Sequence, residues 1–227
     1  LRSAQVAALR QDTGELVWVQ SVGSVPYEAG ERVTTAPMYA HGAVFVGLAN
    51  GDTGGQGRII ALDAVTGEQR WVFFIVPRPG EFGHETWEND AWQWTGDISS
   101  WAPMSADHER GIVYIPTNPP TIDYFGGFSP GHNLFGTTVI ALNVQSGERE
   151  WHFQVVHSDQ WNYDLPNVPM VVDLEVDGRE IPSVIQTTKH GLQFAFNRET
   201  GEPIWPIEEV PVTQTVVPGN WTAATQP

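Results

Sequence analysis

A repeated segment of eleven residues constrains the fold of this chain more than any other feature. Each copy begins with Ala and then Leu or Phe, carries Thr or Ser before a Gly-Glu pair, and ends with Trp. The pattern occurs four times without gaps, at 8–18, 61–71, 141–151 and 195–205. Self-similarity of this kind is the signature of an architecture built from one repeated structural unit.

Each repeat has the pattern of strand, tight turn and strand. In the second copy the apolar run 59–63 is β-prone, the Thr-Gly pair at 66–67 supplies the turn, and 70–74 is extended again. Two further strand-like runs, 36–40 and 43–48, precede this hairpin. Four antiparallel strands per repeat are the content of a propeller blade, and a Trp at a fixed place after each turn suits packing between sheets. We therefore expect an all-β fold, a β-propeller of four-stranded antiparallel blades.

The spacing of the repeats predicts a single partial propeller domain over 1–227. An insertion at about 77–100, rich in Gly, Trp and acids, separates the second repeat from the third. The whole blades are expected at about 33–76, 101–156 and 168–210, with partial strands at both ends. Because propellers contain about four to eight blades, three do not close a ring. The chain is therefore expected to be a fragment that pairs with the remaining blades or with itself.

Composition excludes several classes of partner and site. The chain has 11 Lys and Arg against 27 Asp and Glu, a formal charge of −16. Nucleic acid is not expected as a partner, because phosphates require a basic surface. The longest apolar run, 71–76, is far shorter than the roughly 20 residues that span a bilayer. Without Cys, the chain has neither disulfides nor thiolate metal sites.

With these residues in view, the repeat resembles the tryptophan-docking motif of the PQQ-dependent quinoprotein alcohol and glucose dehydrogenases. Further stretches that resemble the family are 34–37, 50–58, 79–87, 100–103, 114–119, 156–164, 188–191 and 203–206. The resemblance covers essentially the whole chain. It implies an eight-bladed propeller that binds pyrroloquinoline quinone (PQQ) and Ca²⁺, or a lanthanide, on its axis. It also implies a periplasmic or secreted oxidoreductase that oxidises an alcohol or a sugar and passes electrons to a quinone or a cytochrome.

The resemblance implies metal ligands in two loops. Asp52 lies in a Gly-rich loop after the strand 43–48, where the residues alone also fit an ordinary turn. It aligns with a metal-ligating Glu of the family, which is one methylene longer. Asn118, before a proline, fits a turn residue as well, but it aligns with the family's ligating Asn although Thr117 replaces the preceding Gly.

The same resemblance implies cofactor contacts. A Trp at the position of Trp101 forms the floor under the planar quinone, and a Lys or Arg at the position of Lys189 contacts the quinone oxygens, where a cation stabilises developing negative charge. Thr34 aligns with a hydroxyl donor to the PQQ carboxylates, and Asn50 and Gly51 belong to the matching cofactor-lining loop. The alternatives are a core Trp and a solvated surface Lys.

The segment 157–164 contains the candidates for the base. The family's general base is the Asp directly after a Trp, but this chain has Asn162 there, and an amide does not accept a proton as a carboxylate does. Asp164, two residues on, lies on the same side of an extended segment and supplies a carboxylate, as a base or as a metal ligand beside Asn162. Asp159 is a third catalytic candidate. The alternative for all of them is a hydrogen-bonded loop.

Two functions remain open from the sequence. The first is PQQ- and metal-dependent oxidation of a small alcohol or sugar, and the second is a non-catalytic propeller of the same repeat family that acts as a protein-interaction scaffold. Asp52, Trp101, Asn118 and Lys189 all lie off the structural repeat, and their joint presence favours cofactor binding. Asn162 and the length of the chain favour inactivity of this chain in isolation. The insertion at 77–100 is expected either to roof a pocket or to form a surface excursion.

Overall fold

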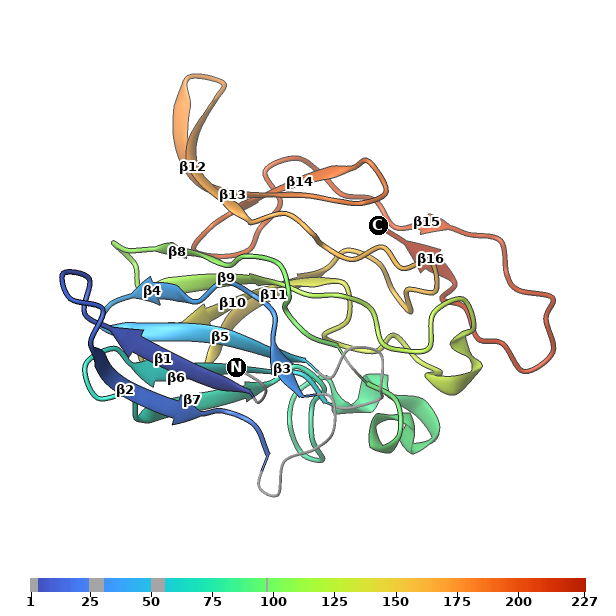
Figure 1. The fold of residues 1–227 in the computed structure, drawn as a ribbon. Coiled ribbons are helices and arrows are strands. Elements are labelled where there is room, and N and C mark those ends of the chain that lie inside the picture. Colours follow the sequence, from blue (N-terminus) through green and yellow to red (C-terminus); the bar gives the residue numbers. More distant parts are fainter. Residues whose placement is uncertain (1–3, 25–30, 50–55, 97) are drawn as a thin grey trace.

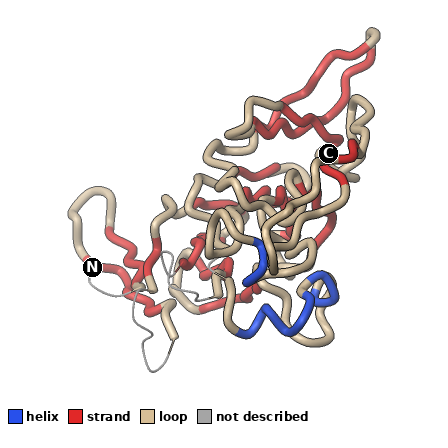
Figure 2. Tube along the Cα trace, turned by 90° about the vertical axis from the view of Figure 1, so that its right-hand side faces the viewer, coloured by secondary structure: helices blue, strands red, loops and turns tan. Residues whose placement is uncertain are grey.

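The fold consists of antiparallel sheets that follow one another in chain order (Figure 1). A computed structural model describes residues 4–24, 31–49, 56–96 and 98–227. In these ranges the chain forms sixteen β-strands and three short 3₁₀ helices. Figure 2 shows strands and loops throughout, with helix confined to short segments. The prediction of an all-β fold is confirmed.

The second and third sheets are the most complete. The second contains β3 (Arg32–Val33), β4 (Met38–Ala40), β5 (Ala43–Ala49), β6 (Arg58–Asp63) and β7 (Gln69–Phe74). β3 and β4 both pair with β5 and share one outer position. The third sheet contains β8 (Ser105–Asp107), β9 (Ile112–Pro116), β10 (Thr138–Asn143) and β11 (Arg149–Gln154) in the order β11-β10-β9-β8. Both hairpins of the repeat therefore form as the sequence predicts.

The sheets at the two ends have fewer strands. The first is the hairpin of β1 (Gln5–Leu9) and β2 (Leu16–Ser21), and the fourth contains β12 (Met170–Val176), β13 (Arg179–Thr187) and β14 (Gln193–Asn197). The expected third whole blade, 168–210, thus has a three-stranded sheet. Its fourth strand is reduced to one bridge, Phe196 with Pro203, because the prolines at 203 and 206 have no amide hydrogen for a ladder. The blade limits given above stay predictions.

The C-terminal residues form a small sheet that the repeat does not predict. It consists of β15 (Val210–Pro211) and β16 (Thr225–Gln226). Its connection to the body of the fold is a pair of hydrogen bonds between Gln226 and the backbone of His157, both of 2.7 Å. This contact brings the end of the described chain beside the loop that follows β11.

The core lies between the sheets rather than inside any of them. One buried cluster lies between the second and third sheets and includes Phe45, Ile59, Val113 and Ile140. Two more clusters fill the spaces between the first and second sheets and between the third and fourth. This arrangement follows from the strand sequences, since apolar residues on both faces of a strand require a neighbouring sheet on each side.

Three of the repeat tryptophans pack in equivalent positions between neighbouring sheets. Each indole Nε1 donates to a backbone carbonyl oxygen of the next repeat. The pairs are Trp18 with Ala64 (3.2 Å), Trp71 with Val144 (3.0 Å) and Trp151 with Arg198 (3.1 Å). In each case the acceptor lies three residues before the turn glycine of the next repeat, and the ring covers that glycine. A Cβ at the glycine would lie 2.6 to 2.7 Å from the ring, and the positive φ also favours Gly there.

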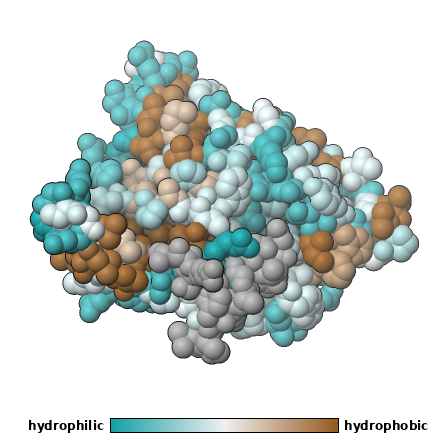
Figure 3. All heavy atoms as spheres, in the orientation of Figure 1, coloured by the Kyte–Doolittle hydropathy of each residue, from teal (hydrophilic) through white to brown (hydrophobic). Residues whose placement is uncertain are grey.

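Trp205 departs from the predicted equivalence of the four tryptophans. It is 55 % exposed, because the described chain has no further repeat whose turn glycine its ring could cover. At the other end, the first sheet exposes Leu9, Leu16, Val17 and Val19. Figure 3 shows these apolar side chains as a brown patch over β1 and β2. Both ends of the series of sheets therefore leave apolar surface uncovered.

The insertion at 77–100 packs into the core and is not a surface excursion. It contains the helices η1 (His84–Thr86) and η2 (Glu88–Gln93). Trp87 is buried and donates its indole N–H to the carbonyl oxygen of Leu134 at 2.6 Å. Ala91 joins the same cluster between the second and third sheets. None of the helices in the described ranges is long and apolar enough to cross a bilayer.

Candidate functional site

Four loops at one end of the third and fourth sheets carry most of the predicted site residues. They are the loop before β8, the loop after β9, the loop after β11 and the β13–β14 turn. Because neighbouring strands are antiparallel, these loops all lie at the end opposite the turn glycines of the repeats. A hydrogen bond of 3.3 Å from the Leu165 amide to the Thr117 carbonyl oxygen joins two of the loops directly.

Trp101 and Asp164 are brought together at this end. The Trp101 indole Nε1 donates to Oδ2 of Asp164 at 3.0 Å. Trp101 is 40 % exposed, so one part of its ring is accessible while its N–H is fixed. The second carboxylate oxygen, Oδ1, is buried and accepts no hydrogen bond from the described residues. Such an oxygen is available to a cation or to a proton-donating ligand.

Lys189 joins the same group from the β13–β14 turn. Its Nζ donates to Oδ1 of Asn162 at 3.2 Å and lies 3.9 Å from Oδ1 of Asp164. Asn162 has a φ of 59°, in the left-handed region that Asn tolerates better than most residues. The alternation of an extended segment is therefore broken at 162, yet the side chains of Asn162 and Asp164 both reach the Lys189 ammonium. Trp101, Asn162, Asp164 and Lys189 form the cluster that we call the Trp101 cluster.

Asp159 has a different place, inside the loop after β11. Its Oδ1 accepts from the Trp161 amide at 2.8 Å, and its Oδ2 accepts from the Tyr163 amide at 2.9 Å and from the Thr137 hydroxyl at 2.8 Å. The carboxyl group is buried, and burial is the main cause that raises its pKa. These bonds hold the backbone that carries Asn162 and Asp164. The geometry thus agrees with the hydrogen-bonded-loop alternative for this residue.

Asn118 lies beside the Trp101 cluster, but its amide oxygen is engaged. Oδ1 accepts from the Ser99 amide at 2.6 Å and from the Ser99 hydroxyl at 2.9 Å, while Nδ2 donates to the Pro119 carbonyl oxygen at 3.0 Å. The residue thereby ties the loop after β9 to the loop that leads to Trp101. Metal ligation through Oδ1 requires that at least one of the Ser99 bonds be given up, since a carbonyl oxygen has two lone pairs.

Two contacts to the segment of the second sheet fix the position of the loop before β8. The hydroxyl of Thr35 donates to the carbonyl oxygen of Ala102 at 3.0 Å, which places the exposed Thr34 next to the Trp101 segment. The Ser100 carbonyl oxygen lies 2.1 Å from where a Cβ at Gly47 would be, so only Gly permits this approach. Asn50, Gly51 and Asp52 lie outside the described residues.

Candidate metal ligands are oxygen atoms of mixed type. No group of three or more His, Asp or Glu side chains in the described ranges is arranged to hold a metal ion. The predicted metal ligands do not form such a group, because two of them are Asn residues and Asp52 lies outside those ranges. Within the described part, the buried Oδ1 of Asp164 is the predicted ligand atom that has no hydrogen-bond donor. Its chemistry fits a hard cation, which prefers carboxylate oxygens.

Ser99 and Thr137 contribute to the site, and the sequence analysis did not identify them. Ser99 holds Asn118, and Thr137 holds Asp159. Neither residue forms a recognisable motif by itself at these positions, so their roles arise only from the folded arrangement. The Ser-Ser pair before Trp101 was the available signal for the first.

Comparison with known proteins agrees with the fold. The model of the PQQ family described as glucose/ethanol/alcohol dehydrogenase, beta-propeller domain, matches residues 13–227. The glycerol dehydrogenase large subunit of Gluconobacter oxydans is 35 % identical over 222 residues, which is 94 % of this chain and 29 % of that protein. The chain therefore spans less than a third of the length of this relative.

Solved structures give the same result. The quinohemoprotein alcohol dehydrogenase ADHIIG of Pseudomonas putida HK5 superposes with a TM-score of 0.81 at 28 % identity, over 92 % of this chain and 32 % of that one. A europium-containing methanol dehydrogenase superposes with a TM-score of 0.80 at 26 % identity, over 89 % of this chain and 38 % of that one.

Proposed function

Because the chain belongs to the PQQ-dependent glucose, ethanol and alcohol dehydrogenase family, whose β-propeller domain model matches residues 13–227, we propose that it contributes part of the active site of an enzyme that oxidises an alcohol or a sugar. The cofactors in this proposal are PQQ and Ca²⁺ or a lanthanide. The observation that carries the proposal is the meeting of an accessible Trp ring, a Lys ammonium and a carboxylate in the Trp101 cluster.

The residues of the Trp101 cluster fit the cofactor by their chemistry. PQQ is planar and carries carboxylates, so it requires an aromatic surface and a cation, which Trp101 and Lys189 supply. When bound, the quinone supplies a two-electron acceptor and the metal ion supplies a Lewis acid. The metal ion would be held by Oδ1 of Asp164 together with Asp52, and by Asn118 and Asn162 through their amide oxygens.

The chain's own groups have distinct roles in this proposal. Lys189 stabilises negative charge that develops near its Nζ. Asp164 substitutes for the carboxylate base that the family carries at the position of Asn162, and it is a weaker base because its donor-free Oδ1 is also the proposed metal ligand. Trp101 keeps the carboxylate of Asp164 in place through Oδ2. Asn162 accepts a hydrogen bond from Lys189 and directs the ammonium toward the site.

The rest of the propeller is part of the proposal. No described atom lies within 4 Å of the Cβ position at Gly14, whereas the equivalent positions in the three later repeats are each covered by a Trp. At the other end of the series of sheets, Trp205 is largely exposed. We infer that further repeats of the tryptophan-docking kind, or a second copy, cover these two ends. The relatives that are quinohemoproteins support a cytochrome as the electron acceptor, with a quinone as the alternative, in the periplasm or outside the cell.

The test is a titration of the full-length protein that contains this chain with PQQ in the presence of calcium, followed by a dye-linked assay over a panel of alcohols and aldoses. The expected result is dye reduction that requires PQQ, the metal and one class of substrate. A Lys189→Gln variant should lose PQQ affinity, and Arg179→Gln, on the exposed β12–β13 hairpin, serves as the matched control. Absence of PQQ binding under these conditions contradicts the proposal and favours a scaffold function.

A further inference from the structure

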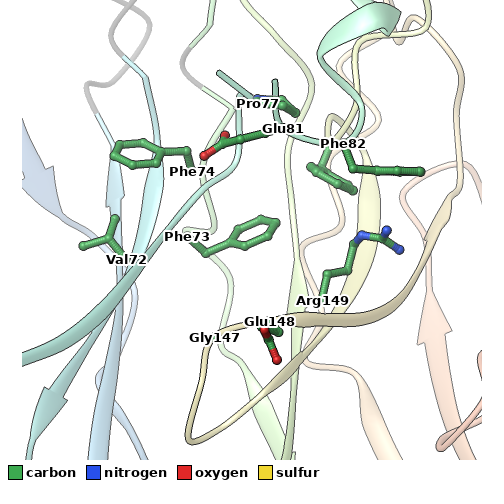
Figure 4. Close-up of a pocket in the computed structure, with 10 residues that line it drawn as sticks. Val72, Phe73, Phe74, Pro77, Glu81, Phe82, Gly147, Glu148 and Arg149 are labelled. Carbon is green, nitrogen blue, oxygen red and sulfur yellow. The ribbon is translucent and has the colours of Figure 1, made fainter. Parts of the chain in front are cut away.

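A cavity of about 420 Å³ lies between the second and third sheets and shares no residue with the Trp101 cluster (Figure 4). It is bounded by β7, by the start of the insertion and by the turn that leads into β11. In Figure 4, Glu81 and Phe74 lie on one side, Phe82 and Arg149 on the other, and Phe73 between them. A cavity of this size accommodates a small organic molecule.

The walls of the cavity are aromatic. Phe73 and Phe135 have ring centroids 5.5 Å apart, and Phe82 stacks on Phe135 at 6.4 Å with an angle of 28° between the rings. Phe82 is 54 % exposed although it is a large apolar side chain at the mouth of the cavity. Flat side chains in this arrangement favour a flat, apolar ligand body.

Arg149 is the cation of this cavity, and among the described residues no carboxylate lies within 4.0 Å of it. Its guanidinium lies 4.1 Å from the centre of the Phe82 ring and donates from Nη1 to Nδ1 of His152 at 3.1 Å. Burial lowers the pKa of the Arg149 guanidinium. Ion pairs with carboxylates in the same ranges are formed by Arg10, Arg58, Arg70, Arg110 and Arg198.

Arg78 and Arg179 also form no ion pair with a described carboxylate, but both are exposed, whereas Arg149 is partly buried in a chain with 27 acids against 11 bases. Removing a guanidinium from water costs free energy. An anion that accepts hydrogen bonds from the planar guanidinium offsets this cost. Apart from the Nη1 bond to His152, the guanidinium keeps further N–H donors, and a carboxylate can accept two parallel hydrogen bonds from a guanidinium.

Two glutamates at the cavity restrict the charge of the ligand. Oε2 of Glu81 accepts from the Arg78 amide at 2.7 Å, and Oε2 of Glu148 accepts from the Ser146 hydroxyl at 3.2 Å. Both carboxylates are therefore held near the cavity without forming an ion pair with Arg149. Their negative charge opposes phosphates and other polyanions, because like charges raise the free energy of binding. One anionic group, placed at Arg149, is compatible with them.

We propose that this cavity is a binding site for a planar aromatic monocarboxylate, with the ring between Phe73 and Phe82 and the carboxylate on Arg149. The site is separate from the proposed dehydrogenase centre, and neither proposal depends on the other. Aromatic contact supplies most of the affinity, and Arg149 selects the acid over its neutral amide.

Isothermal titration calorimetry of the chain with naphthalene-2-carboxylate tests the proposal. Saturable one-to-one binding with a submillimolar Kd is expected, and the neutral naphthalene-2-carboxamide and inorganic phosphate should bind at least about tenfold more weakly. Arg149→Gln should weaken binding of the acid about tenfold or more, while Arg179→Gln, an exposed arginine on β13, leaves it unchanged.

Two further variants locate the site. Phe82→Ser removes an exposed side chain and should weaken both the acid and the amide, with the circular dichroism of the chain unchanged. Lys189→Gln should leave binding of the acid unchanged, because that residue belongs to the Trp101 cluster. Failure of the acid to bind overturns the proposal. So does binding that is unaffected by Arg149→Gln, or binding that is lost in Lys189→Gln.

Discussion

The indole N–H of Trp101 donates to the carboxylate of Asp164 at 3.0 Å, across 63 residues of the chain. The bond joins the loop that enters the third sheet to the loop that leaves it. One oxygen of Asp164 is thereby fixed, and the other is buried without a donor. The same hydrogen bond thus positions an aromatic surface and a carboxylate oxygen that can accept a hydrogen bond or bind a cation.

Asp164→Asn is expected to weaken binding of a metal ion about tenfold or more, because it removes the negative charge at the donor-free oxygen. Terbium luminescence sensitised by tryptophan measures the affinity, and Trp101 is near enough to act as the sensitiser. Asp177→Asn, in the β12–β13 turn at the opposite end of the fourth sheet, is the matched control. Equal terbium affinity in the wild type and in Asp164→Asn contradicts the ligand role.

Trp151→Ala is expected to lower the free energy of unfolding by about 3–5 kcal/mol, since it removes a buried ring that packs on the next repeat and donates to the Arg198 carbonyl oxygen. Trp205→Ala should lower it by less than about 1 kcal/mol, because that equivalent residue is largely exposed. Urea unfolding of the chain measures both. Similar losses for the two variants argue that Trp205 is covered in solution, as self-association through that end requires.

His152 makes stability depend on pH. Burial, and next the charge of Arg149, lower the pKa of His152 from 6.5 to about 4. The unfolded chain binds the proton first as pH falls, so the free energy of unfolding should decrease from pH 6.5 toward pH 4, by up to about 3 kcal/mol from this residue.

The measurement for His152 is urea unfolding over that pH range. His152→Phe should remove this part of the slope while the aromatic contacts of Phe82 and Phe135 are kept. A slope that is identical in the variant shows that other groups cause it.

Asn162→Asp is expected to raise kcat of the protein loaded with PQQ and metal by about 10²–10⁴, because it places a carboxylate base where the family carries one. Lys189 already donates to this side chain at 3.2 Å, so the new carboxylate has a cationic partner that favours its ionised form. Asn162→Ala is the control and should not gain activity. An unchanged kcat in Asn162→Asp, with PQQ and metal shown to be bound, means that Asp164 already serves fully as the base.

The repeat made most of the fold predictable, because its turn glycine and Trp define both strands of each outer hairpin. The register between sheets follows as well, since Trp18, Trp71 and Trp151 all donate to the same backbone position of the next repeat. Two prolines weaken the last strand of the fourth sheet, and they were visible in the sequence. The β15–β16 pair was not predictable, because its contacts are to a loop distant along the chain.

The sequence predicts candidate residues for the site but not the contacts between them. The strand order places the loops of adjoining sheets at one end of the fold. Four site residues meet there for this reason: Trp101, Asn162, Asp164 and Lys189. The hydrogen bonds from Ser99 to the amide oxygen of Asn118 depend on side-chain geometry. The spacing of residues along the sequence does not encode that geometry. The partly buried position of Arg149 beside Phe82 is likewise invisible in a segment that has the pattern of an ordinary repeat.

The central claim is that the Trp101 cluster binds PQQ, and titration of tryptophan fluorescence with PQQ in the presence of calcium tests it most directly. We predict saturable quenching in the wild type, with an affinity that falls about tenfold or more in Trp101→Phe and in Lys189→Gln and is unchanged in Arg179→Gln. Quenching that saturates at the same PQQ concentration in all four proteins would contradict the claim.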